Sequence, residues 1–292
     1  MSFLDRIKAC NNASPDAFRP FRVAGQTVGH VGNGFIEILK IRGDGAFLIT
    51  DTAVDLDPKL KDAAARTDRL DKVMRDLAAA DFITGWREEL FGVYAPTDMP
   101  GKAAPLLHLE RAAIPLFGVR AFGVHMTGYV KKPEGLYIWV ARRARDKPTY
   151  PGMWDNTVAG GMPVGYSIAE NLAKECGEEA AIPADLAVQA RPVGIVSYTY
   201  SETTRAGFLT LKPDVQFCFD LELPDGFTPH NTDGEIESFH LWPVKEFAEK
   251  IRDTDEFKFN CNLVAIDFLI RHGVITPDNT PEYLALCRGL RQ

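Results

Sequence analysis

A glycine-rich loop that leads directly into a short acidic helix is the feature that most constrains this sequence. The segment AGGMPVGYSIAENLAKECGEEAAI, residues 159–182, carries Glu175, Glu178 and Glu179. In an α-helix, positions three and four apart lie on one face. Three carboxylates on one face repel one another, and hard divalent cations such as Mg²⁺ prefer such oxygen ligands, often shared with substrate phosphates. The segment therefore predicts a metal site that binds a diphosphate.

Local signals delimit the helix. Ser167 and Glu170 have the spacing of a capping box, which predicts that the helix begins just after Ser167. Pro183 follows the last apolar residue and predicts the end of the helix. The alternative is that the glutamates form only a solvated helix face, as charged runs usually do. The glycine loop and the cap favour the metal site.

The opposite side of the helix carries the residues expected to pack. Ile168, Leu172 and Cys176 are spaced four apart and predict a buried stripe. We expect Cys176 to pack as a small hydrophobic residue and not to act as a nucleophile. Gly177 costs roughly 1 kcal/mol against Ala in a helix interior, which suggests close packing at that position.

Residues 160–182 resemble the Nudix box, whose pattern is G-x5-E-x7-R-E-U-x-E-E-x-G-U, with U an aliphatic residue. Gly160 opens the pattern, and all three metal-site glutamates stand at the right spacing. There are four departures: Tyr166 replaces the first Glu, Lys174 replaces Arg, Cys176 replaces an aliphatic residue and Ala181 replaces the late Gly. The resemblance implies a hydrolase that cleaves diphosphate linkages.

The same resemblance implies roles for individual residues. Glu175, Glu178 and Glu179 would hold Mg²⁺ or Mn²⁺, together with a backbone carbonyl near Ala159. Lys174 would orient the catalytic Glu175, because it keeps the positive charge of the family's Arg while losing the bidentate fork. Glu235 fits the additional distant acid of the family, as ligand or base, with Glu237 as the alternative. Glu235 as an ordinary surface acid is the competing interpretation.

Substrate contacts are expected just before the box. Arg143 and Lys147 lie in a basic segment and suit phosphate recognition. Trp154 is expected to stack on a heteroaromatic ring of the substrate. Packing in the core is the alternative for this ring.

Composition narrows the class of protein. The chain has 292 residues, 46% hydrophobic and 25% charged, which is typical of a soluble globular protein of one large or two ordinary domains. A net charge of −7 argues against nucleic-acid binding, and no apolar run reaches the ~18 residues of a membrane span. Five dispersed cysteines without a C-x-x-C pair fit a reducing compartment, so we expect a cytoplasmic enzyme.

The order of predicted elements divides the chain into two domains. Residues 1–110 are expected to form a smaller α+β domain, with a hairpin at 21–31 and an amphipathic helix at 66–80. A proline- and glycine-rich segment, residues 96–105, is the candidate linker. Residues 111–292 are expected to form the hydrolase domain. The resemblance implies a Nudix α/β/α sandwich with a mixed sheet for this second domain.

Longer segments resemble one Nudix subfamily, often labelled thiamine-pyrophosphokinase-related. They include ERAAIPLFGVRAFGVHMTGYV, NTDGEIESFHLW and DTDEFKFNCNLVAIDFLIRHG. Some members are understood to hydrolyse diphosphates of oxidised thiamine to monophosphates, which implies a similar activity here. A kinase activity gains no support, because the sequence has no G-x-x-x-x-G-K-[ST] loop.

Three functions stay open at this point. The first is a diphosphatase of thiamine diphosphate or its analogues, and the second is a Nudix hydrolase of a dinucleotide, ADP-ribose or coenzyme A. The third is a non-catalytic ligand sensor, against which the three retained glutamates argue. In each case the partner is a small molecule. The sequence leaves open the phosphorus attacked, the general base and whether the N-terminal domain covers the active site or mediates a homodimer.

Overall fold

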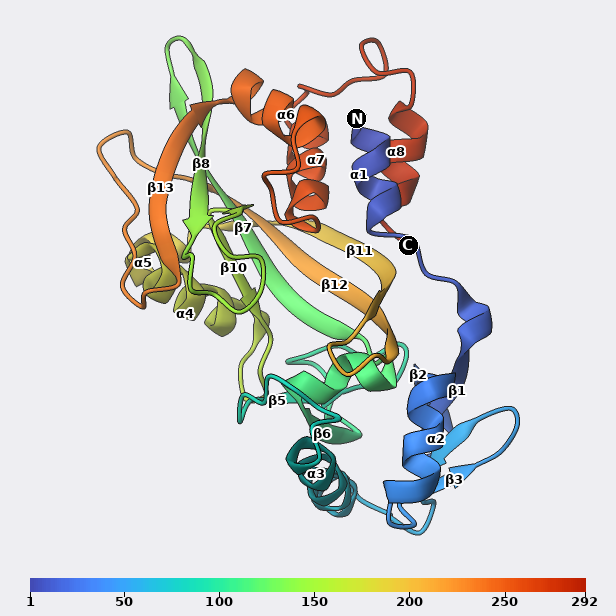
Figure 1. Cartoon of the computed structure of the whole chain (residues 1–292). Helices are drawn as coiled ribbons and strands as arrows, with labels where there is room; N and C mark the ends of the chain where they lie inside the picture. The colour runs from blue at the N-terminus through green and yellow to red at the C-terminus, as the bar shows by residue number, and fades with distance from the viewer.

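The computed structural model describes residues 1–292, apart from the side chain of Pro15. The chain forms two parts, each with its own sheets and helices (Figure 1). The first helix, α1 (Phe3–Ala9), is separated from the rest of the first part and packs beside the last helix, α8 (Tyr283–Gly289). Only the capping box of Ser2 and Asp5 signals this short helix in the sequence.

The first part contains two small sheets and two longer helices. Its elements are η1 (Pro15–Ala17), β1 (Phe18–Val23), β2 (Gln26–Gly32), α2 (Asn33–Arg42), β3 (Phe47–Ile49), β4 (Val54–Leu56), α3 (Ala63–Ala79), β5 (Leu90–Val93), β6 (Leu107–Glu110) and the 3₁₀ helix η2 (Arg111–Phe117).

The expected hairpin and amphipathic helix are both confirmed. Strands β1 and β2 pair antiparallel, and the sheet has the order β2-β1-β4-β3. Helix α3 begins at the N-cap Asp62 and buries the predicted stripe of Leu70, Val73, Met74 and Leu77. Strand β4 is only three residues long, so its apolar-polar-apolar alternation is too short to mark a strand in the sequence.

The proline- and glycine-rich segment 96–105 is not a linker. It joins β5 and β6, which pair antiparallel from Leu90–Glu110 to Val93–Leu107. The apolar cluster of the first part continues through Phe117 to Val119. We therefore propose that the boundary lies after Val119, and not after residue 110.

The second part is built on one large sheet. Its elements are β7 (Ala121–Lys132), β8 (Gly135–Arg143), β9 (Trp154–Asp155), β10 (Val158–Gly161), α4 (Ile168–Ala180), α5 (Ala184–Ala187), β11 (Arg191–Thr203), β12 (Leu209–Glu222), β13 (Ile236–Pro243), α6 (Val244–Asp253) and α7 (Cys261–Arg271), followed by α8.

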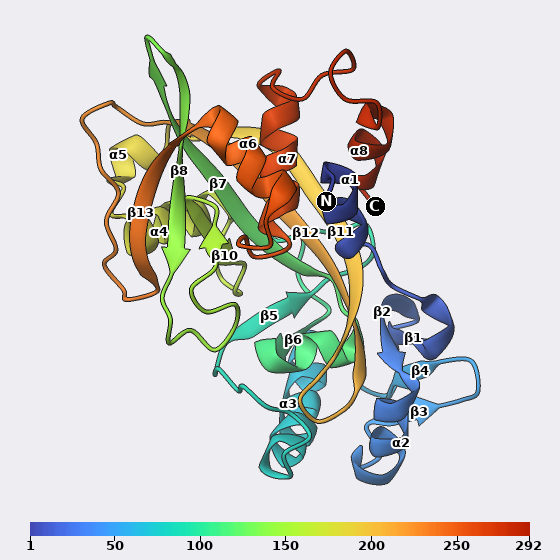
Figure 2. The same cartoon turned by 45° about the horizontal axis from the view of Figure 1, so that its top comes forward.

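This sheet is mixed and covered by helices on both faces, so the predicted three-layer α/β/α architecture is confirmed. The strand order is β11-β12-β7-β8-β13, with β10 added to β7 and β9 to β8. Strands β7 and β12 are parallel, and the other pairs are antiparallel. Helices α4 and α5 cover one face, and α6 and α7 cover the other, with α1 and α8 beside them (Figures 1 and 2). The central β7 is buried on both faces, which explains why its sequence is mostly apolar and does not alternate.

The two parts meet at a close backbone contact. Gly32 of β2 lies against the carbonyl oxygen of Leu209, at the start of β12, where a Cβ would overlap that oxygen. Next to it, Phe208 packs its ring against Phe35 and Phe82 at centroid distances of 5.4 and 6.1 Å. The tip of the β11–β12 hairpin is thus fixed on the first part. None of the helices is both long and apolar enough to cross a membrane.

Candidate active site

Helix α4 forms as its sequence predicts. Ser167 is the N-cap and accepts from Glu170 N at 3.3 Å, while Ser167 N donates to the Glu170 carboxylate at 2.8 Å. Leu172 and Cys176 are buried against the sheet. The helix ends at Ala180, and Ala181 takes the left-handed conformation with φ 50°. A left-handed residue after a helix is usually Gly, which is the residue that the Nudix pattern has here.

The expected close packing at Gly177 is wrong. A Cβ added at this position would meet nothing within 4 Å. The glycine that is required by packing is instead Gly160, in β10. A Cβ there would lie 2.6 Å from Glu175 Oε1 and would overlap the Cγ and Cδ of the same side chain. Glu175 therefore lies directly against the glycine-rich strand.

The three box glutamates occupy different environments around this strand. Glu179 is buried and accepts a hydrogen bond from Ala159 N at 2.8 Å. Glu175 is largely buried, and Glu178 is half exposed. Lys174 joins the latter two, because its Nζ lies 3.2 Å from Glu175 Oε1 and 2.6 Å from Glu178 Oε2. An ammonium group thus compensates two of the carboxylates, at the place where a cation is expected.

Burial and mutual repulsion raise the pKa values of the inner carboxyls. Burial raises the pKa of Glu175, as do the charges of Glu178 and Glu235, while Lys174 lowers it. Burial raises the pKa of Glu179 well above its ordinary value, and the charges of Asp155, Glu175 and Glu235 add to this rise. Acids that are costly to ionise together are a signature of a functional site and of a site suited to a divalent cation.

Glu235 lies at the same site, as its effect on both inner glutamates indicates. It precedes β13, in a loop fastened to the end of α4. In this loop Thr232 Oγ1 donates to Glu178 O at 2.6 Å, and His230 N donates to Ala180 O at 3.2 Å. Lys147 forms an ion pair with Glu235. Burial opposes ionisation of Glu235, but Lys147, Arg143 and Arg111 prevail and lower its pKa. The alternative acid, Glu237, pairs with Arg145 at 3.4 Å.

Arg143 and Trp154, which we expected to contact the substrate, are buried inside the protein instead. Arg143 is buried and donates to Asp155 Oδ2 at 2.8 Å and to the carbonyls of Thr149 and Tyr150. Trp154 is buried in the cluster on the α6 and α7 face, with its ring 4.7 Å from that of Trp242. Both residues therefore hold the segment that leads into the glycine loop. Lys147, in contrast, lies at the site, where it forms an ion pair with Glu235.

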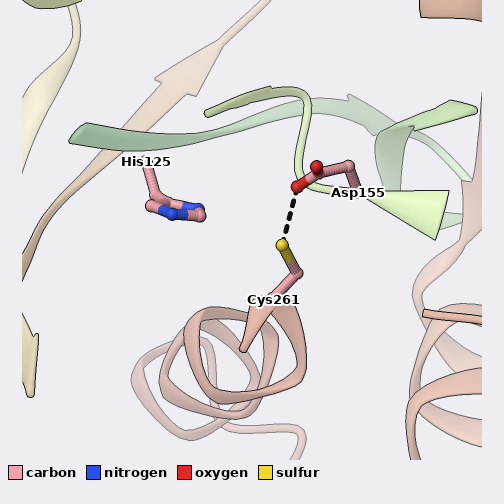
Figure 3. Close-up of side chains that lie close together, drawn as sticks. All are labelled: His125, Asp155 and Cys261. Carbon is pink, nitrogen blue, oxygen red and sulfur yellow. Dashed lines mark hydrogen bonds between the residues drawn. The ribbon is translucent and has the colours of Figure 1, made fainter. Parts of the chain in front are cut away.

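Three potential metal ligands form a buried cluster behind the glycine loop. His125 of β7, Asp155 of β9 and Cys261 at the start of α7 place their ligand atoms within 4.8 Å of one another (Figure 3). Cys261 Sγ donates to Asp155 Oδ1 at 2.6 Å. Although burial opposes it, the charges of Lys258 and Arg143 lower the pKa of Asp155 to about 2. Two cations already compensate this carboxylate, and its bond with Cys261 joins β9 to α7, while His125 bonds Asn156.

The structure adds residues that the sequence pattern does not mark. Val164, just after β10, donates its N–H to Leu90 O at 3.0 Å, so β5 of the first part lies beside the glycine loop. Phe91 Cζ lies 2.9 Å from the position that a Cβ on Gly161 would occupy. The charge of Arg111, at the start of η2, lowers the pKa of Glu235. These contacts join distant parts of the chain, and only the pairing of β5 with this loop brings them together.

Comparisons with known proteins match both parts of the chain. Two family models match the chain: "Domain of unknown function (DUF4743)" over residues 2–121 and "NUDIX domain" over residues 120–262. The chain is 41% identical over 292 residues to Nudix hydrolase 24, chloroplastic, of Arabidopsis thaliana, and 42% identical over 301 residues to Nudix hydrolase 20, chloroplastic, of the same plant. Each alignment covers 99% of this chain and 77% of the plant protein.

A third relative is an uncharacterized protein of Saccharomyces cerevisiae, 34% identical over 254 residues, which make up 82% of this chain and 72% of the yeast protein. The match to named hydrolases extends over both parts of the chain, and the NUDIX domain model spans the residues of the acidic helix and the glycine loop. The chain belongs to the Nudix hydrolase family, with an additional N-terminal domain of the DUF4743 type.

Proposed function

We propose that this Nudix hydrolase converts thiamine diphosphate, or its oxidised analogues, to the monophosphate with the aid of Mg²⁺ or Mn²⁺. The observation that carries the hydrolytic part is the group of carboxylates around Gly160, with Glu175 against the loop and Glu179 on Ala159 N. The thiamine part rests on the subfamily resemblance of the flanking segments. Hydrolysis of a dinucleotide, of ADP-ribose or of coenzyme A is the alternative.

The residues present suit a hard divalent cation. Glu175, Glu178 and Glu179 offer carboxylate oxygens, and the carbonyl of Ala159 is the further candidate ligand. Lys174 already balances two of these carboxylates, which supports the view that the site needs positive charge. When bound, the metal supplies charge neutralisation for the diphosphate and acidifies a water molecule.

The protein's own residues then carry the proton. Glu175 has a raised pKa and accepts a proton from the attacking water, while Lys174 holds its carboxylate in place. The water oxygen bonds to one phosphorus, and the bond from that phosphorus to the bridging oxygen breaks. Glu235, held by Lys147, is the other candidate base. The products are a monophosphate ester and inorganic phosphate.

A phosphate-release assay with Mg²⁺ and with Mn²⁺ tests the proposal. The substrates are thiamine diphosphate, its oxo and oxy derivatives, ADP-ribose, dinucleotides and coenzyme A, each with and without inorganic pyrophosphatase or alkaline phosphatase to reveal every product. We expect preferential turnover of the thiamine compounds. Turnover of nucleotides alone would keep the metal site and reject the thiamine assignment. Absence of all turnover would favour the ligand sensor.

A further inference from the structure

Arg111 lies at the edge of the acidic site, although it belongs to the first part of the chain. It is the first residue of η2 and its side chain is 46% exposed. Its positive charge lowers the pKa of Glu235, and the direct ion-pair partner of Glu235 is Lys147. Arg111 is therefore one of the cations near the acidic site, together with Lys147 and Lys174.

Arg111 is held in place by contacts that lead to the glycine loop. Its Nη1 donates to Glu89 Oε2 at 2.7 Å, and its guanidinium lies 5.6 Å from the centroid of the Phe91 ring. The same ring packs on Gly161, whose neighbour Gly160 lies against Glu175. One aromatic ring therefore connects Arg111 with the loop of the active site.

The backbone under Arg111 is also fixed. Glu110 is buried and accepts hydrogen bonds from Arg87 N, Glu89 N and Ala112 N at 2.9 to 3.2 Å. Arg111 N donates to Glu89 O at 2.8 Å. Because β5 is in turn hydrogen-bonded to Val164, the segment around Arg111 cannot shift without moving the glycine loop.

We propose that Arg111 binds a non-bridging oxygen of the substrate's diphosphate, so that the N-terminal domain contributes a residue to the active site. The inference rests on the proposed hydrolysis of a diphosphate compound and assigns one of its binding residues. A guanidinium has five N–H donors, and Glu89 accepts from one of them, so donors remain for a phosphate. Arginine is well suited to this because its planar group binds phosphate oxygens in pairs.

In this role Arg111 contributes to substrate binding and not to the chemical step. Arg111 lies at the edge of the site and neither holds the metal nor accepts the proton. Its loss should therefore weaken the binding of the substrate and of the transition state equally. A charge-assisted hydrogen bond to phosphate is worth about tenfold or more in affinity. The negative charge of Glu89 opposes the approach of a diphosphate, whereas the amide oxygen of a glutamine can still accept from Arg111 Nη1 and hold the guanidinium in place.

The test measures KM and kcat for the wild type and for the variants Arg111→Ala, Arg111→Lys and Glu89→Gln, on whichever substrate the wild type turns over. Arg75→Ala is the matched control, because Arg75 is 51% exposed, pairs with Glu88 and stacks on Trp86 in the same domain. Inhibition by inorganic pyrophosphate provides a second measure of binding. Wild-type turnover tests the proposed function separately.

We expect Arg111→Ala to raise KM about tenfold with kcat within about twofold, Arg111→Lys to be intermediate, and Arg75→Ala to behave as the wild type. Glu89→Gln should leave KM unchanged or lower it. An unchanged KM and inhibition constant in Arg111→Ala would overturn the proposal. An equal rise of KM in Arg111→Ala and Glu89→Gln would also overturn it, because it would mark the ion pair as a structural contact only.

Discussion

Glu175 lies directly against the Cα of Gly160, so that any side chain at position 160 would displace the carboxylate. A Cβ would come within 2.6 Å of Glu175 Oε1. We expect Gly160→Ala to lower kcat by about 100-fold, because a shift of about 1 Å in a catalytic group can cost this much. Steady-state kinetics at saturating Mg²⁺ checks this.

Gly177→Ala is the matched control for this variant. A Cβ at Gly177 would meet nothing within 4 Å, and the residue lies inside α4. The alanine variant should keep its activity and gain up to about 1 kcal/mol in free energy of unfolding. Equal losses of activity in both variants would contradict the specific contact between Gly160 and Glu175.

Glu178 is half exposed and bonded to Lys174, so its replacement should disturb the fold little. We expect Glu178→Gln to abolish hydrolysis while circular dichroism and the melting temperature stay near those of the wild type. The amide keeps the shape of the side chain but removes a negative charge that the metal requires. Near-wild-type turnover of this variant in Mg²⁺ would show that the metal assignment is wrong.

Lys174 sets the ionisation of Glu175. Its charge lowers the pKa of that carboxyl, against burial, which raises it. Lys174→Gln should therefore raise the pKa of Glu175 further. Because the base must be ionised, the acidic limb of the kcat/KM profile should move to higher pH. Lys174→Arg, which restores the family's usual residue, should keep the wild-type profile and serves as the control.

The raised pKa values of Glu175 and Glu179 couple metal binding to pH. In the metal-free protein these carboxyls keep their protons to higher pH than an ordinary glutamate, so their contribution to stability is present below the ordinary pKa of a glutamate and is lost as pH rises through the raised values. A divalent cation replaces the protons. We expect Mg²⁺ to raise the melting temperature more at pH 8 than at pH 5, and an equal rise at both would contradict this coupling.

The sequence predicted the elements whose signals are local. The capping box of Ser167 and Glu170 located the start of α4, and the spacing of Leu70, Val73 and Leu77 located α3. The three glutamates that we propose as metal ligands could also be placed on one helix face, because an i, i+3, i+4 cluster needs only the geometry of one helix.

Features that depend on long-range pairing could not be predicted. Arg111 and Phe91 reach the site only because β5 pairs with the loop after β10, about 70 residues later along the chain. The position of Arg143 before the box indicated phosphate binding, but the fold places Asp155 beside it as its hydrogen-bond acceptor. The role of an arginine depends on its partners, which a single sequence does not reveal.

Ala181 offers a test of the one departure from the Nudix pattern that affects the backbone. It adopts φ 50°, a left-handed conformation that costs an L-residue about 1 kcal/mol, and its N–H closes the helix on Gly177 O. Ala181→Gly should raise the free energy of unfolding by about 1 kcal/mol without a change in kcat. Urea unfolding of the two proteins under identical conditions checks this.

Asp155 is the anion that compensates the buried Arg143 and the partly buried Lys258 behind the active-site loop. It accepts from Arg143 Nη1 at 2.8 Å, and Lys258 Nζ lies 3.7 Å away. Asp155→Asn should lower the free energy of unfolding by about 3 kcal/mol or more, because the charge of Arg143 would stay buried without an anionic partner. In the wild type the lowered pKa of Asp155 contributes stability above the ordinary pKa of an aspartate, which is lost as pH falls toward 2. Denaturation at pH 7 should therefore separate wild type and variant clearly, and the difference should shrink under strongly acidic conditions.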